Sequence, residues 1–239
     1  MEILGVNISE LQKNDIFDKF FNQEKGYICV TSVHGLIEAN DNSLVMDAFK
    51  SSFANIPDGM PIIYYSQLFR KTKLKRIPGY DLLDLFLDFA NKNNLKIATV
   101  GSNPETLNKF KKKLNSSFPN IIYEDFNTDD IEIFSKESVN NINYFIDQVK
   151  PNCVLIFLST PKQDWLMYEL NKNGLSEKFI GFGAAVDYYV GNIEKAPKLL
   201  SQLSLEWLFR LVQDPKRLYK RYFKIVPKFF YLLIFKNKN

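Results

Sequence analysis

Short apolar runs alternate with amphipathic stretches along most of the chain, and the spacing of the apolar positions changes between them. β-Branched and apolar runs predict strands at 26–31, 95–100, 120–124, 152–158 and 178–182. Apolar residues at helical spacing predict helices over 37–53, 81–91, 101–114 and 138–149 and after 160, with a tight loop at 55–61. The run at 152–158 is almost continuously apolar, as in a parallel strand that is buried on both faces. The alternation predicts an α/β fold with a Rossmann-like, mostly parallel sheet flanked by helices.

From Ser201 onward the pattern changes to helical, basic and aromatic. We therefore predict an α/β catalytic-type domain over 1–200 and a helical appendage over 201–239. The segment from Lys195 to the end has eleven basic and two acidic residues, whereas the rest of the chain has a net charge of −5 and the whole chain +4. A tail this basic indicates an anionic partner, which could be nucleic acid, anionic lipid or a phosphorylated substrate.

The aromatic residues of the tail narrow this choice. The apolar density after Phe223 favours an amphipathic helix that lies in a lipid interface. A nucleic-acid arm, or a helix packed on the core with a solvated basic face, is also compatible with the pattern. The longest apolar run, 229–235, is far shorter than the roughly 20 residues that span a bilayer.

Composition excludes several classes of protein. An apolar share of 46% with 15% aromatic residues is typical of a globular chain and not of a disordered or fibrous one. Two cysteines, Cys29 and Cys153, are too few for a disulfide scaffold, and both lie in strand-like runs. With no signal-peptide pattern at the N-terminus, this indicates buried reduced thiols and a cytoplasmic protein.

Three polar segments follow predicted strands, where ligands of parallel sheets bind: 31–35, 101–105 and 159–163. Helix N-termini at these places could bind phosphate. The alternative is that 102–105 and 160–163 are capping boxes, in which these polar residues only begin a helix. The chain contains neither a dinucleotide-binding glycine fingerprint nor a P-loop.

Asp58 is the most suggestive carboxylate, because it lies between Pro57 and Gly59 in a tight loop. A firmly held carboxylate can accept the proton of a hydroxyl nucleophile, although an ordinary Asp-Gly turn also explains this residue. No two aspartates are separated by one residue, so a D-x-D metal motif is missing. His34 is the only histidine, which excludes a multi-histidine zinc site.

Seven motifs in order give the chain a specific resemblance. They are 30–35 (VTSVHG), 57–61 (PDGMP), 76–81 (RIPGYD), 159–165 (STPKQDW), 181–187 (GFGAAVD), 195–197 (KAP) and 205–217, which begins LEWLFRL. Together they resemble the WecG/TagA/CpsF glycosyltransferases, glycosyltransferase family 26, over about 26–222.

The resemblance implies an inverting, metal-independent enzyme that needs no cofactor. It would move a sugar from a UDP-sugar to a polyprenyl-pyrophosphate-linked sugar during synthesis of teichoic acid, capsule, exopolysaccharide or an O-antigen-like polymer. The donor sugar stays open between an N-acetylmannosamine type, glucose and a related hexose or uronic acid. The tail would hold the enzyme on the anionic inner face of the bacterial membrane, with no nucleic-acid partner; a homo-oligomer is left open. The rival interpretation is a nucleotide- or nucleic-acid-binding α/β protein without transferase activity.

The resemblance also assigns roles to single residues. Asp58 falls on the position of the family's catalytic base. Predicted substrate-binding residues are Thr31, His34, Arg76, Gly101, Ser102, Gln163, Asp187, Arg210, Arg217, Lys220 and Arg221, of which Lys220 and Arg221 are alternatives for one tail cation. Gly101 and Ser102 enter as a helix-start turn that could face phosphate.

Overall fold

The structure is a computed structural model of the 239-residue chain. It describes all residues except 70–73, 127–134, 174–176, 203–204 and 236–239. Side chains at 198, 202, 217, 220 and 221 also lie outside the described part.

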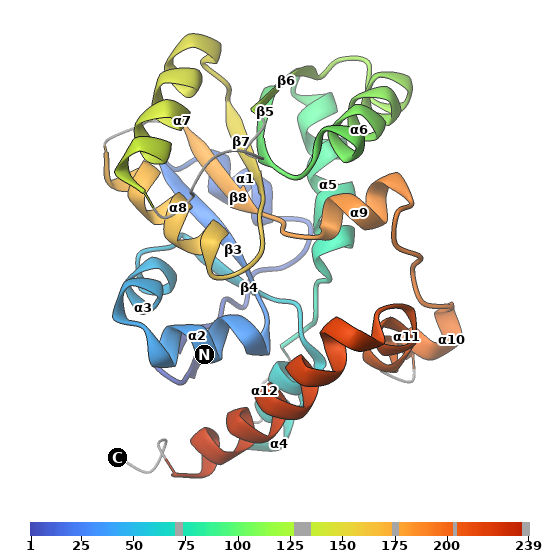
Figure 1. Cartoon of the computed structure of the whole chain (residues 1–239). Coiled ribbons are helices and arrows are strands. Elements are labelled where there is room, and N and C mark those ends of the chain that lie inside the picture. Colours follow the sequence, from blue (N-terminus) through green and yellow to red (C-terminus); the bar gives the residue numbers. More distant parts are fainter. Residues whose placement is uncertain (70–73, 127–134, 174–176, 203–204, 236–239) are drawn as a thin grey trace.

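A six-stranded parallel sheet forms the centre of the molecule (Figure 1). Its strand order is β4-β3-β8-β7-β5-β6, with β3 at Gly26–Thr31, β4 at Ala54–Pro57, β5 at Lys96–Gly101, β6 at Ile122–Phe126, β7 at Cys153–Phe157 and β8 at Lys178–Gly181. Every neighbouring pair of these strands is parallel. The predicted α/β class and parallel sheet are confirmed. A separate antiparallel pair, β1 (Glu2–Ile3) and β2 (Val6–Asn7), precedes the sheet.

Helices cover both faces of the sheet, and each face has its own hydrophobic core. One core is formed with α2 (Val33–Asp41), α3 (Ser43–Lys50), α4 (Met60–Phe69), α7 (Lys136–Val149) and α8 (Lys162–Lys172). The other is formed with α1 (Ile16–Phe21), α5 (Gly79–Lys92), α6 (Pro104–Ser117) and α9 (Ala185–Val190). Strand residues divide between the cores with period two: Val154 faces the first, and Cys153 and Leu155 face the second. Both cysteines are buried free thiols.

The region before Asp58 differs from the sequence prediction. The predicted helix over 37–53 is two helices, because Asn42 ends α2 and its side chain accepts from Leu44 N–H to begin α3. The loop predicted at 55–61 from its two prolines and glycine is wrong over 55–57, which belong to β4. Pro57 is tolerated because β4 is an edge strand that pairs only with β3.

The N-terminal segment closes the other side of β4. Ser9 N–H donates to the Asn55 carbonyl at 2.9 Å, and Asn55 N–H donates to Ser9 Oγ at 3.0 Å. The Asn55 side chain donates to the carbonyls of Asn7 and Phe49. These bonds hold the strand that leads directly to Asp58.

Neither predicted capping box forms as expected. Asn103, not Ser102, caps α6 by accepting from Thr106 N–H, and Pro104 occupies the first turn. α8 begins at Lys162, and Pro161 at its cap position offers no side-chain acceptor, so the box predicted from Thr160 is wrong. Gly101 and Ser102 instead turn with φ of 98° and 68° at the carboxyl end of β5.

The C-terminal region is helical, as predicted: α10 (Lys198–Gln202), α11 (Glu206–Gln213) and α12 (Pro215–Phe235). α12 lies along the end of the molecule that also carries α4, and it packs on α2 through Phe229 (Figure 1). Lys228 forms an ion pair with Asp41 of α2. None of the helices within the described ranges is long and apolar enough to cross a membrane. The division at residue 200 stays a prediction.

Phe229→Ala should loosen α12 from α2. Phe229 is 0% exposed, so its loss leaves a cavity that typically costs about 3–5 kcal/mol. We expect a lower urea midpoint and faster tryptic cleavage within α12. The matched control is Phe230→Ala, which removes the neighbouring ring, 39% exposed, and should change little. Equal effects of the two substitutions would contradict this packing.

Candidate active site

Asp58 follows β4 at the carboxyl edge of the sheet, where its backbone is held on two sides. Its N–H donates to the Thr31 carbonyl at the end of β3, at 2.9 Å. Its own carbonyl accepts from Arg76 Nε. The neighbouring strand and the segment before α5 therefore fix the direction in which the carboxylate points, as expected for a firmly held loop.

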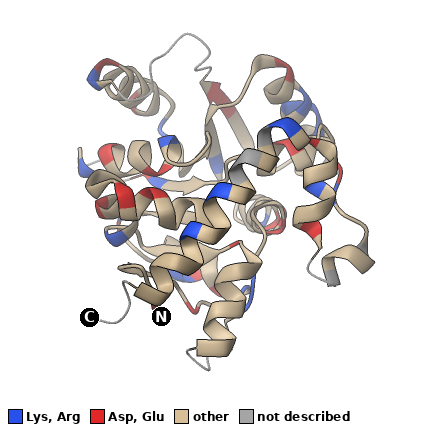
Figure 2. Cartoon of the chain, turned by 60° about the horizontal axis from the view of Figure 1, so that its bottom comes forward, with Lys and Arg blue, Asp and Glu red and all other residues tan. Residues whose placement is uncertain are grey.

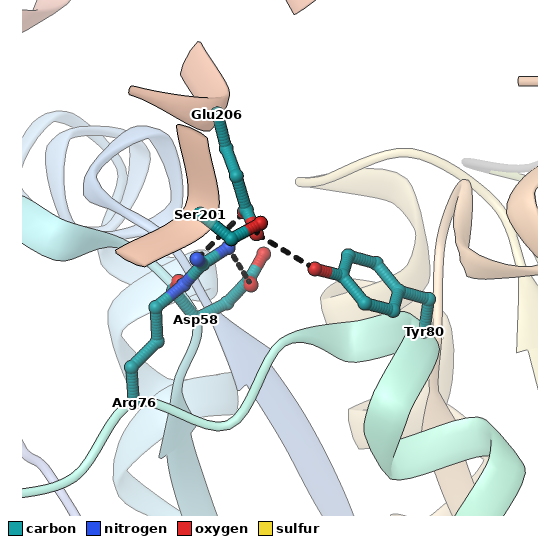
Figure 3. A network of polar contacts seen from close by, with 5 residues as sticks. All are labelled: Asp58, Arg76, Tyr80, Ser201 and Glu206. Carbon is teal, nitrogen blue, oxygen red and sulfur yellow. Dashed lines mark hydrogen bonds and ion pairs between the residues drawn. The ribbon is translucent and has the colours of Figure 1, made fainter. Parts of the chain in front are cut away.

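Arg76 connects Asp58 to the C-terminal helices (Figure 3). Its Nη2 lies 3.5 Å from Asp58 Oδ1, and its Nη1 lies 2.6 Å from Glu206 Oε2 at the start of α11. Glu206 Oε1 accepts from the Tyr80 hydroxyl at 2.8 Å and from Ser201 Oγ at 2.7 Å. Residues from both predicted parts of the chain thus share one polar network.

The carboxylates of this network have opposite pKa shifts. Burial raises the pKa of Asp58 although Arg76 and Arg210 oppose it, and Glu206 raises it further. Burial also disfavours ionised Glu206, but the Ser201 hydrogen bond and the Arg76 charge outweigh it, so the pKa of Glu206 is lowered. Asp58 is 30% exposed and Glu206 13% exposed. The more accessible carboxylate is therefore the one that accepts a proton more readily.

Arg210 of α11 approaches the same site beside two tyrosine rings. Its guanidinium carbon lies 5.4 Å from the centroid of the Tyr188 ring, which is 5.1 Å from the Tyr80 ring. Lys195 Nζ lies 4.6 Å from the Tyr80 ring centroid and pairs with Asp84. The predicted cation Arg210 thus reaches the surroundings of Asp58, whose pKa its charge lowers.

Two further predicted residues lie at or under the carboxyl edge of the sheet. Thr31 is fully buried, and its hydroxyl donates to the Cys29 carbonyl at 3.4 Å. Its contact with Asp58 is made by the Thr31 backbone carbonyl, which accepts from Asp58 N–H. Gln163 is buried against Gly181, where an added Cβ would lie 3.0 Å from its Cδ. Gln163 Oε1 has no hydrogen-bond partner among the described residues.

The contacts described for the other predicted residues are with groups other than Asp58. His34 Nε2 lies 3.1 Å from Glu38 on α2. Asp187 accepts from Asn192 at the end of α9, at 3.1 Å. Arg217, Lys220 and Arg221 lie on α12, and their side chains are outside the described part of the structure.

The sequence interpretation missed Glu206, Tyr80, Ser201 and Tyr188. One signal was available, because Glu206 is one of only two acidic residues in the strongly basic C-terminal segment. Tyr80 also lies within the motif that begins at Arg76. Among residues with described positions, no group of three or more His, Cys, Asp or Glu side chains is arranged to hold a metal ion.

Asp164 is a second unusual carboxyl, in the first turn of α8. It is completely buried, and neither oxygen has a hydrogen-bond partner of normal geometry within the described residues. Burial raises its pKa to about 7, against the influence of the nearby Thr160 and Cys29. The carboxyl is therefore protonated in the folded state over much of the acidic range.

Comparisons with known proteins identify the family of the chain. A family model described as "Glycosyl transferase WecG/TagA/CpsF family" matches residues 1–239. The chain belongs to this family. It is a glycosyltransferase, as the resemblance of its motifs implied.

Two relatives illustrate the similarity. A protein of Bacillus subtilis (strain 168) is 29% identical over 196 residues, which cover 81% of this chain and 73% of the relative. One of Staphylococcus aureus (strain MW2) is 26% identical over 238 residues, which cover 97% and 91%. Both are named N-acetylglucosaminyldiphosphoundecaprenol N-acetyl-beta-D-mannosaminyltransferase.

Asp164→Asn should change how stability depends on pH. With a folded pKa of about 7 and an unfolded pKa of about 3.9, the folded state binds more protons between these values. Stability is then fully present below the unfolded pKa and is lost as pH rises toward 7, by about 1.4 kcal/mol for each unit of pKa difference. The amide cannot ionise, so this decline should disappear.

Urea unfolding at about pH 5 and about pH 8 measures the difference. The control is Asp88→Asn, which removes an exposed carboxylate and should keep the wild-type slope. A wild-type slope in the Asp164 variant would mean that Asp164 titrates normally.

Proposed function

We propose that this glycosyltransferase moves a sugar from a UDP-sugar to polyprenyl-pyrophosphate-linked N-acetylglucosamine, with Asp58 as the catalytic base. The observation that carries the proposal is the Asp58 carboxylate, held at the carboxyl edge of the sheet with a raised pKa and with Arg76 and Arg210 beside it. The relatives' names contain both the acceptor, N-acetylglucosaminyldiphosphoundecaprenol, and the transferred N-acetylmannosamine. We therefore take N-acetylmannosamine as the first donor sugar to test and cell-wall teichoic acid as the first pathway.

The reaction would proceed with inversion. An acceptor hydroxyl attacks the anomeric carbon from the face opposite UDP, and Asp58 takes the hydroxyl proton. The new bond joins the acceptor oxygen to the anomeric carbon, while the bond to UDP breaks and its electron pair leaves with the diphosphate. A raised pKa suits Asp58 to this role, because a base works best when its pKa is near the working pH.

The leaving diphosphate needs positive charge and N–H donors. Arg210 is the described cation that is best suited, since Arg76 is already held by Asp58 and Glu206. The helix starts after Gly101–Ser102 and near Gln163 would add the positive ends of two helix dipoles. His34 and Asp187 would contribute to the donor pocket, and Arg217 with Lys220 or Arg221 would bind a diphosphate from α12. This chemistry needs no bound metal or cofactor.

The acceptor lipid places the enzyme at a membrane surface in this proposal. α11 and α12 expose large apolar side chains: Trp207, Leu208, Val212, Tyr219, Phe223, Phe230, Tyr231, Ile234 and Phe235. α4, which lies at the same end of the molecule as α12, also exposes Leu68 and Phe69 (Figure 1). α12 also carries basic positions along its length, among them Lys216, Lys224 and Lys228 (Figure 2). Apolar side chains together with lysines favour the anionic inner face of the bacterial membrane.

Asp58→Asn should lower turnover by roughly 10²–10⁴-fold and leave UDP binding nearly unchanged, because only the proton acceptor is lost. The measurement is acceptor-dependent UDP release from a panel of UDP-sugars, with and without EDTA, alongside calorimetric binding of UDP. Asp88→Asn is the control, since it removes the same charge from an exposed position. Normal turnover by Asp58→Asn would exclude the role. UDP binding by the wild type without transfer to any acceptor would favour the nucleotide-binding alternative.

Vesicle binding should depend on the exposed apolar side chains of α12. We expect Tyr231→Ser with Ile234→Ser to weaken sedimentation with phosphatidylglycerol vesicles, because two exposed apolar side chains are lost. Tyr144→Ser is the matched control, as Tyr144 is an exposed ring on α7 at the other end of the molecule. Added salt should also weaken binding, since each basic residue near the surface contributes about 1 kcal/mol that salt screens. Unchanged binding by the double variant would place the contact elsewhere.

A further inference from the structure

Glu206 begins α11, in the predicted appendage, yet most of its contacts are with residues before position 200. Its Oε2 pairs with Arg76 at 2.6 Å, and its Oε1 accepts from Tyr80 at 2.8 Å as well as from Ser201 at 2.7 Å. Both oxygens of this nearly buried carboxylate are thus engaged by protein donors (Figure 3). Such a group is suited to hold other side chains in place.

Arg76 is the side chain that Glu206 holds. Its Nε donates to the Asp58 carbonyl and its Nη1 to Glu206, while its Nη2 stays 3.5 Å from Asp58 Oδ1. A guanidinium is planar and rigid, so fixing two of its nitrogens fixes the third. The contact with Glu206 therefore sets the distance between Arg76 and the Asp58 carboxylate.

This distance affects the chemistry of Asp58. A close pair with Arg76 would stabilise the ionised carboxylate and make it a weaker base. The long contact orients the carboxylate and leaves its other oxygen without an Arg76 contact. Glu206 draws the guanidinium toward α11 and so keeps the pair from closing.

We propose that Glu206 is a positioning residue, which holds Arg76 between two carboxylates so that Asp58 is oriented but not neutralised. This inference rests on the proposed role of Asp58 as the base.

The charged groups that face Asp58 come from the segment before α5 and from α11. Arg76 lies before α5, and Arg210 and Glu206 lie on α11, while the Tyr188 hydroxyl of α9 and the Gly79 N–H are also close. Glu206 is the only anion among these described neighbours. Removing its charge, and releasing Arg76 toward Asp58, both shift the Asp58 titration to lower pH.

The test compares Glu206→Gln with Glu194→Gln. Both remove one negative charge, but Glu194 is exposed, and only its backbone carbonyl has a hydrogen bond among the described residues. The first readout is the Asp58 titration by NMR of carboxyl-¹³C-labelled aspartate, with Asp58→Asn to assign the signal. We expect a shift to lower pH in Glu206→Gln and none in Glu194→Gln. This readout needs no substrate.

The second readout is the pH profile of kcat/KM. We expect the acid limb to move to lower pH in Glu206→Gln and the plateau to fall by about tenfold through misplacement of Arg76. An unmoved Asp58 titration in folded Glu206→Gln, or equal shifts in the two variants, would overturn the inference. Absence of transfer by the wild type would instead contradict the proposed function, because the NMR titration is independent of turnover.

Tyr80→Phe tests the same inference if Glu206→Gln does not fold. It removes one of the hydrogen bonds that orient Glu206 but keeps both charges. We expect a several-fold lower kcat/KM at an unchanged unfolding midpoint. Unchanged kcat/KM would overturn the inference. It would mean that the orientation of Glu206 does not matter, whereas a residue that positions Arg76 must itself be oriented.

Discussion

The candidate active site depends on one guanidinium shared between two carboxylates. Arg76 binds the backbone and side chain of Asp58 on one side and Glu206 on the other. Ion pairs at this degree of burial stabilise little on their own, because desolvation offsets much of the attraction. What the arrangement provides is geometry: the strand end, the segment before α5 and the C-terminal helices must all be in place for Arg76 to make its contacts.

The rest of the fold brings these three parts together. The sheet is buried on both faces, so its strands fix where each polar strand end lies. Thr31 and Asp58 become neighbours because β3 and β4 are adjacent and parallel. The C-terminal helices are anchored separately, through the buried Phe229 on α2 and through Glu206 at the site. Docking at these two points determines where Arg210 lies relative to Asp58.

Much of the fold could be predicted from sequence, because apolar periodicity reports burial directly. The runs around Cys153 and Ile97 read as strands for that reason. β4 could not be predicted, since an edge strand with Asn55 and Pro57 carries no such pattern and depends on partners far along the chain. The role of Glu206 could not be predicted for the same reason. It depends on a contact with Arg76, 130 positions earlier, and no local sequence pattern indicates that contact.

The hydrogen bonds between Ser9 and Asn55 have a consequence for the chemistry as well as for folding. An edge strand normally exposes unpaired backbone groups that invite another chain to pair with it. Here Ser9 of the N-terminal segment pairs with the N–H and carbonyl of Asn55, and Ile77 N–H donates to the Pro57 carbonyl. Asp58 follows that strand directly, so the backbone around residue 9 helps to hold the Asp58 carboxylate in place. Substitutions in the segment around Ser9 would therefore change the position of Asp58.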